Sequence, residues 1–177
     1  MTHTPNPFSG LRGALLATLL LLTAAVRADP LAEYHLKAAF LYNFISFTEW
    51  PAGTGSTLNL CIYGPDPFGE DLDKLQSRSV AGRTLAVRRT NSASGLGTCQ
   101  IVFITRPMME NLSSVLGSLS SPVLTVADSP GAARQGVAIN MGTEQNKINF
   151  EANLGAARSS GVNLSSKLLR LAREVYQ

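Results

Sequence analysis

Cysteine and histidine are scarce in this chain, which has two of each among its 177 residues. Zinc, haem and iron–sulfur centres need several such ligands close together, so the sequence predicts no metal and no cofactor of these kinds. A G-x-S-x-G turn is also missing, and His35 is the one histidine beyond residue 28. A catalytic triad depends on strict geometry around its base, so we interpret His35 as a solvated surface residue and predict no catalytic residue.

An excess of charge of one sign is lacking as well. The sequence has 15 basic and 12 acidic residues, a formal net charge of +3, and Arg12 and Arg27 account for two of the basic residues. Nucleic-acid-binding proteins concentrate positive charge on one face, and no basic cluster is present here. The sequence therefore predicts no nucleic-acid partner.

No apolar run is long enough to predict a membrane-spanning helix. The longest, residues 14–26, has 13 uncharged residues and is followed by Arg27, whereas a spanning helix needs about 20. Val26 and Ala28 then suit the two positions that a signal peptidase reads. We therefore expect residues 1–28 to be a cleavable signal peptide and residues 29–177 to be one soluble periplasmic domain. That remainder is long enough to bury a core of its own.

The sequence beyond residue 29 alternates between helix-like and strand-like patterns. A helix is predicted over residues 31–48, since Pro30 suits a first turn and Trp50-Pro51 ends the helical pattern. Short apolar runs, typical of strands buried on both faces of a parallel sheet, occupy residues 58–63, 85–87, 100–105 and 122–126. Helical patterns at residues 68–76 and 107–119 alternate with these runs and predict β-α-β units.

The end of the sequence follows a different pattern. Apolar residues alternate with others over residues 137–141 and 148–150, on either side of a turn predicted at residues 142–147, which indicates an antiparallel hairpin. A closing helix is predicted over residues 165–176. The expected fold class is therefore α/β: a single three-layer domain with a mainly parallel central sheet, a C-terminal β-hairpin, and long N-terminal and C-terminal helices.

The predicted first helix has more apolar surface than one sheet would cover. One stripe at helical spacing contains Leu36, Phe40, Phe44 and Phe47, and a second contains Tyr34, Ala38, Leu41 and Ile45. One stripe packs on the domain, whereas the other needs the C-terminal helix, a second copy or a partner protein to cover it. The candidate partner-binding residues are Phe40, Leu41, Phe44, Ile45, Phe47 and Trp50.

Residues 64–69 (Gly-Pro-Asp-Pro-Phe-Gly) follow the first predicted strand and open a helix. Open α/β sheets bind ligands at this position, so Pro65, Asp66, Pro67 and Phe68 are candidate ligand-crevice residues. The two prolines remove backbone donors, and no phosphate-binding motif is present, which favours a rigid turn.

The same region is rich in acidic residues, namely Asp66, Glu70, Asp71 and Asp73. Paired carboxylates of this kind could act as acid and base in a hydrolase. Acidic side chains also favour the positive end of a helix dipole, and we prefer that interpretation.

Several blocks of the sequence resemble the YfiR-like family, and together they span nearly all of residues 29–177. They are EYHLKAAFLYNF at residues 33–44 with EWP at 49–51, LCIYG at 60–64 with DPFG at 66–69, CQIVFI at 99–104, VLTVAD at 123–128, and INFEANL at 148–154 with LSSKLLRLA at 164–172. Each block alone is a weak signal, but their order and spacing agree with the family.

The resemblance implies a periplasmic regulatory protein and not an enzyme. The protein after which the family is named restrains an inner-membrane diguanylate cyclase by acting on its periplasmic part, and an outer-membrane lipoprotein relieves the restraint by sequestering the regulator. The partner that holds the regulator thereby sets cyclic di-GMP and biofilm formation. The resemblance also implies a homodimer. Related domains are fused to membrane sensor kinases, so the alternative function is a small-molecule-sensing domain that acts on another membrane receptor or kinase.

Two arguments conflict over a candidate disulfide between Cys61 and Cys99. An oxidising compartment favours the bond, and the family pattern presents both cysteines together. If the strands at residues 58–63 and 100–105 are parallel neighbours in simple register, however, Cys61 lies beside Phe103 and far from Cys99. At about 3.3 Å per residue the offset exceeds the Cα separation of about 7 Å that a disulfide tolerates, unless the chain bends or the register shifts.

Overall fold

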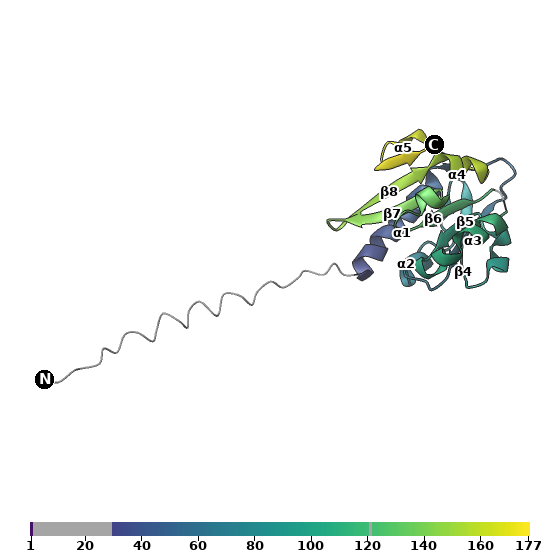
Figure 1. The fold of residues 1–177 in the computed structure, drawn as a ribbon. Helices are drawn as coiled ribbons and strands as arrows, with labels where there is room; N and C mark the ends of the chain where they lie inside the picture. Colours follow the sequence, from purple (N-terminus) through teal and green to yellow (C-terminus); the bar gives the residue numbers. More distant parts are fainter. Residues whose placement is uncertain (2–29, 121) are drawn as a thin grey trace.

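The computed structural model describes Met1, residues 30–120 and residues 122–177 of the chain (Figure 1). The predicted cleavage site, and all of the predicted signal peptide except Met1, lie outside these residues. The strands are β1 (Thr48–Glu49), β2 (Thr57–Tyr63), β3 (Ser79–Val80), β4 (Arg83–Thr90), β5 (Ile101–Ile104), β6 (Leu124–Ala127), β7 (Ile139–Glu144), β8 (Lys147–Asn153), β9 (Asn163–Leu164) and β10 (Glu174–Tyr176). The α-helices are α1 (Pro30–Ser46), α2 (Glu70–Asp73), α3 (Leu112–Ser118), α4 (Leu154–Ser159) and α5 (Ser166–Leu169), and the 3₁₀ helices are η1 (Ala93–Thr98), η2 (Arg106–Asn111) and η3 (Ala133–Gln135).

The central sheet has 8 strands in the order β10-β8-β7-β6-β5-β2-β4-β3. Strands β4, β2, β5, β6 and β7 run parallel to one another, and β3 and β8 are antiparallel to their neighbours β4 and β7. A separate two-stranded sheet joins β1 to β9. The predicted α/β fold with a mainly parallel central sheet is confirmed.

Alternate side chains of the strands enter two apolar cores, one on each face of the sheet. On one face, Leu60 and Ile62 of β2 belong to a core with residues of α1 and α2. On the other face, Cys61 and Tyr63 belong to a core with residues of η1 and α3. Strands buried on both faces explain why their sequences are continuous apolar runs.

The predicted C-terminal hairpin is formed by β7 and β8, whose register runs from Ile139 opposite Ala152 to Glu144 opposite Lys147. Its turn is shorter than predicted and consists of Gln145 and Asn146, with φ angles of 50° and 61°. Positive φ at both central residues matches the twist of a two-residue hairpin loop. The strands therefore extend further than the sequence pattern indicates.

The prediction of a long C-terminal helix over residues 165–176 is wrong. Helix α5 covers only Ser166–Leu169, and Glu174–Tyr176 forms the edge strand β10 beside β8. The backbone N–H of Arg173 donates to the carbonyl of Phe150 at 2.8 Å, which guides the chain from the helix to the sheet edge. Pairing with β8, and the strand propensity of Val175 and Tyr176, outweigh the helical spacing of the apolar residues.

Candidate functional site

Helix α1 carries most of the predicted partner-binding residues, but three of them belong to the core. Leu41, Phe44 and Ile45 are at most 1% exposed. The Phe44 ring packs on Phe150 of β8, with centroids 4.9 Å apart. The folded domain leaves almost no accessible surface on these three side chains. We therefore correct their prediction as partner contacts and assign them to the core. The sheet itself covers more of α1 than the sequence pattern indicates.

The other candidates keep part of their surface. Phe40, Phe47 and Trp50 are half-buried against the core, and Leu36 on the same helix is 46% exposed. The indole N–H of Trp50 donates to the carbonyl of Ile45 at 3.2 Å, which orients the ring at the end of α1. We call Leu36, Phe40, Phe47 and Trp50 the α1 apolar surface.

The predicted ligand crevice at residues 65–68 is a turn held by its own side chains. Asp66 accepts hydrogen bonds from the backbone N–H of Phe68 at 2.8 Å and from Nε of Arg89 at 2.7 Å. The Phe68 ring is buried and meets Phe103 edge-on at 4.8 Å between centroids. Asp66, Pro67 and Phe68 line a shallow hollow, and exposed Pro65 is outside its lining.

Three of the four acidic residues of this region, Asp66, Asp71 and Asp73, form ion pairs with nearby cations. Arg89 binds Asp66 at 2.7 Å and Asp73 at 2.9 Å. Hydrogen bonds from Lys74 and His35 lower the pKa of Asp71. A pair of carboxyl groups that acts as acid and base needs one member with a raised pKa. The contacts of Asp71 lower its pKa instead.

Cys61 and Cys99 form a disulfide, with their Cα atoms 5.9 Å apart. The register of β2 and β5 places Val102, rather than Phe103, beside Cys61. Cys99 lies before β5 and directly after η1, and its N–H donates to the carbonyl of Leu96 at 3.0 Å. The shifted register and this bend together bring Cys99 back over β2.

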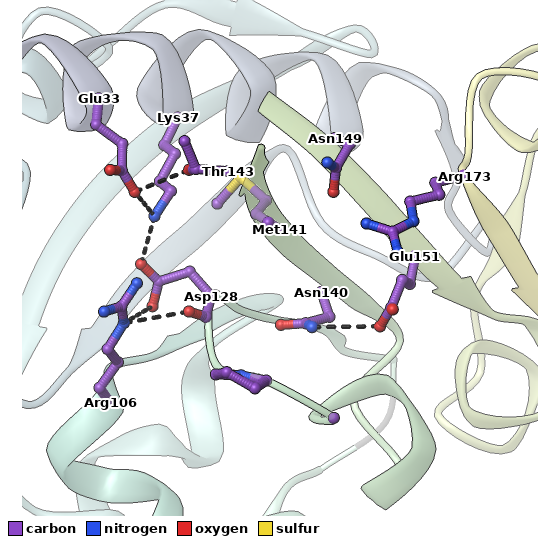
Figure 2. Close-up of a pocket in the computed structure, with 13 residues that line it drawn as sticks. Glu33, Lys37, Arg106, Asp128, Asn140, Met141, Thr143, Asn149, Glu151 and Arg173 are labelled. Atoms are coloured by element: carbon purple, nitrogen blue, oxygen red, sulfur yellow. Dashed lines mark hydrogen bonds and ion pairs between the residues drawn. The ribbon is translucent and has the colours of Figure 1, made fainter. Parts of the chain in front are cut away.

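A polar cavity of about 410 Å³ opens at the carboxyl ends of β5 and β6 (Figure 2). Asp128 directly follows β6 and Arg106 is the second residue after β5, and the ends of parallel strands lie at one edge of a sheet. Glu33 and Lys37 reach the cavity from α1, and Asn140 reaches it from β7. The wall is completed by Glu151 and Asn149 of β8, Thr143, Met141 and Gly142 of β7, and Pro130, Gly131 and Arg173.

Lys37 and Asp128 form a buried ion pair in this wall. Each side chain is 1% exposed, and Nζ of Lys37 donates to Oδ2 of Asp128 at 2.7 Å. Lys37 also binds Glu33 at 2.5 Å, and the Tyr34 hydroxyl donates to Asp128 at 2.6 Å. A buried ion pair is tolerated when further hydrogen bonds satisfy its atoms. These contacts fix α1 to the edge of the sheet.

Two neighbours of the ion pair have shifted pKa values. Burial and the hydrogen bond to Asp128 raise the pKa of Tyr34, so its hydroxyl stays protonated and continues to donate. Partial burial acts to raise the pKa of Glu33, but hydrogen bonds from Lys37 and Thr143 lower it overall. Glu33 is therefore held as a carboxylate beside the cavity.

Sequence reasoning missed this cavity. It assigned no site role to Glu33, Lys37, Arg106 or Asp128. One signal in the sequence could have indicated it. Arg106 and Asp128 each come just after an apolar run that predicts a parallel strand, where open α/β sheets bind ligands.

Two further features are missing from the part of the chain that the structure describes. Among residues 30–120 and 122–177, no group of three or more His, Cys, Asp or Glu side chains is placed to hold a metal ion. Within the same ranges, no helix combines the length and the apolar character needed to cross a membrane.

Two solved structures share the arrangement of secondary structure to different degrees. The ABC domain in complex with L-Trp from Streptococcus pneumonia has 10% sequence identity and a TM-score of 0.54, over 78% of this chain and 60% of that one. A conserved domain protein from Vibrio cholerae O1 biovar El Tor has 8% identity and a TM-score of 0.44, over 80% of this chain and 60% of that one. The chain thus spans about 60% of the length of each structure. At 10% identity the first likeness concerns the fold alone.

The comparison of the sequence with protein families is more specific than the likeness of folds. Residues 34–173 match the YfiR/HmsC-like family. The matched range contains nearly all of α1, the disulfide and the whole central sheet except the last strand. This chain therefore belongs to the YfiR/HmsC-like family, as the blocks of sequence at residues 33–172 predict.

Proposed function

We propose that this protein is a periplasmic regulator of cyclic di-GMP signalling that binds the periplasmic part of an inner-membrane diguanylate cyclase and restrains it. The observation that carries the proposal is membership of the YfiR/HmsC-like family over residues 34–173. The protein acts in this account by binding and not as an enzyme. Release of the cyclase raises cyclic di-GMP and favours biofilm formation.

The proposal includes a division of the chain. Residues 1–28 direct export and are cleaved, and residues 29–177 are the mature regulatory domain in the periplasm. The uncharged run at residues 14–26 and the small residues at Val26 and Ala28 support this division. Sequencing the N-terminus of protein from the periplasmic fraction tests it.

The α1 apolar surface is the proposed contact for the cyclase. Aromatic side chains that keep some surface are frequent anchors in protein interfaces, because they bury a large area with little loss of conformational freedom. Phe40, Phe47 and Trp50 offer such side chains on one helix and the residues that follow it. A homodimer and an outer-membrane lipoprotein that sequesters the regulator are further proposed partners.

A second candidate function is small-molecule sensing that acts on another membrane receptor or on a sensor kinase. The polar cavity at the carboxyl ends of β5 and β6 favours it, since open α/β sheets bind ligands at that edge. The turn at residues 65–68 is a weaker ligand site than this cavity, because the polar atoms of Asp66 are already paired.

Deletion of the gene tests the first proposal. We expect cyclic di-GMP and surface attachment to rise in the deletion strain and to return when the gene is supplied in trans. Unchanged cyclic di-GMP under several growth conditions would contradict the proposal. Small-molecule sensing through a kinase would instead alter phosphorylation of that kinase without this change.

A further inference from the structure

We propose that the polar cavity at the carboxyl ends of β5 and β6 binds a small zwitterion, a molecule with one carboxylate and one ammonium group and the size of a short polar α-amino acid. The inference concerns ligand binding by this domain, and it does not depend on which membrane protein is the partner.

Arg106 supplies the carboxylate-binding end of the cavity. Its Nε donates to the backbone carbonyl of Asp128 at 3.2 Å and lies 3.6 Å from Oδ1 of the same residue, which holds the guanidinium at the wall. The two terminal nitrogens of Arg106 have no hydrogen-bond partner among the described residues, and its side chain is 61% exposed. A guanidinium that is held at Nε and free at both ends presents a fork that suits a carboxylate.

Glu151 and Asn149 supply the ammonium-binding end. Oε2 of Glu151 accepts from the Asn140 amide at 3.3 Å, and its other carboxylate oxygen has no partner within the described ranges. The Asn149 amide, also in the wall, makes no hydrogen bond to any described residue. Figure 2 shows Arg106 on one side of Asn140 and Glu151 on the other, so the two charged ends face the cavity from different sides.

A buried carboxylate oxygen lies next to Arg106 in the wall. Oδ1 of Asp128 is buried and accepts no hydrogen bond from the residues that the structure describes. A buried polar atom without a hydrogen bond costs free energy, and native proteins seldom keep one without a reason. The atom has almost no accessible surface and Nε of Arg106 lies 3.6 Å from it, so it attracts Arg106 to the wall and does not itself contact a ligand.

The composition of the wall narrows the class of ligand. Its cations are Lys37, Arg106 and Arg173, the last already paired at 3.1 Å with Glu144 outside the lining, and its anions are Glu33, Asp128 and Glu151. Both signs of charge are therefore present, and a polyanion is not favoured. Few apolar side chains, chiefly those of Met141 and Pro130, are present to pack on a large aromatic group. A volume of about 410 Å³ lies in the range of small-molecule sites.

Calorimetric titration of the purified protein tests the proposal. The probes are glycine, alanine, serine, asparagine and aspartate, with acetate and ethylamine as ligands that carry only one of the two charges. We expect at least one amino acid to give saturable heat and a higher melting temperature, and acetate and ethylamine to give neither. Arg106→Gln should weaken this binding about tenfold or more, since it removes a charged bidentate contact. Arg158→Gln, a matched change at an exposed arginine of α4 outside the cavity, should bind like the wild type.

Three results would overturn the proposal. They are the absence of saturable heat with every amino acid at millimolar concentration, acetate binding as tightly as the amino acids, and equal loss of binding in Arg106→Gln and Arg158→Gln. None of these would affect cyclic di-GMP in the deletion strain, so failure of the ligand site and failure of the regulator proposal are distinguishable.

Discussion

Lys37 lies on α1 with an ammonium group that is 1% exposed and touches two carboxylates, Asp128 and Glu33. Burial of a charge costs several kcal/mol unless a partner compensates it. The two carboxylates, and the Tyr34 hydroxyl on Asp128, provide that compensation. The pair thus joins the first helix to the end of β6, far away in sequence, and fixes one wall of the cavity.

We predict that Lys37→Met lowers the free energy of unfolding by about 3 kcal/mol, because Asp128 remains buried without its closest cation. Urea denaturation followed by circular dichroism measures the change. Lys74→Met is the matched control, since Lys74 forms an exposed ion pair with Asp71 on α2 and its loss should leave stability nearly unchanged. Equal stability of Lys37→Met and the wild type would contradict the role of the pair.

Glu33 gives the domain a specific dependence on acid pH. Its pKa is lower in the folded protein than the ordinary value of 4.5, so its contribution to stability is present above that value and is lost as the pH falls through the folded pKa. We predict that the wild type is more stable than Glu33→Gln near neutral pH and that the difference shrinks in acid. Denaturation curves between neutral pH and pH of about 3 test this, and a difference that grows in acid would contradict it.

At the scale of elements, the sequence predicts the first helix and the parallel strands but not the C-terminal segment. The predicted helix at residues 31–48 is present as α1, and the four predicted parallel strands are present as β2, β4, β5 and β6. Burial on both faces explains the continuous apolar runs of β5 and β6, whereas β4 is half-buried or exposed apart from Leu85. The sequence at residues 165–176 also has helical spacing, but its backbone pairs with β8 instead. That pairing is long-range, so the local sequence does not reveal it. The short strands β1, β3 and β9 carry no local signal for the same reason.

Phe44 and Phe47 belong to the same predicted apolar stripe, but they should respond differently to a charge because their burial differs. Phe44→Asp places a carboxylate at a site that is 1% exposed, and we predict that the domain unfolds, since a buried unpaired charge costs several kcal/mol. Phe47→Asp alters a half-buried ring of the α1 apolar surface. We predict that this variant keeps the circular dichroism spectrum of the wild type and fails to lower cyclic di-GMP in the deletion strain. Full complementation by folded Phe47→Asp would show that this surface does not contact the cyclase.

The disulfide joins η1 to β2 across a sequence separation of 38 residues. In the chain-entropy estimate, closing such a loop stabilises the domain by about 3 to 4 kcal/mol. We predict that Cys61→Ser/Cys99→Ser melts at a lower temperature than the wild type. Alkylation of denatured, unreduced protein followed by mass spectrometry should leave both cysteines of the wild type unmodified. Two alkylated thiols in material from the periplasm would contradict the bond.

At the scale of the whole molecule, the sequence predicts the fold class and the family better than it predicts the site. The family signal is spread over residues 34–173, so it survives errors in single elements. The cavity depends on α1 reaching Asp128, and that long-range contact does not follow from local periodicity. The sequence alone distinguishes partner-binding residues from core residues only in part, because an apolar stripe has the same spacing whether the sheet or a partner covers it.

The account rests on contact between the α1 apolar surface and a membrane-bound diguanylate cyclase. Site-specific photo-crosslinking in intact cells tests this most directly, with a crosslinking phenylalanine analogue at Phe47 and, as the control, at exposed Arg158 on α4. We predict that position 47 crosslinks to the periplasmic part of an inner-membrane protein that synthesises cyclic di-GMP and that position 158 does not. Crosslinks from position 47 to a second copy alone, or to no such membrane protein, would contradict the account.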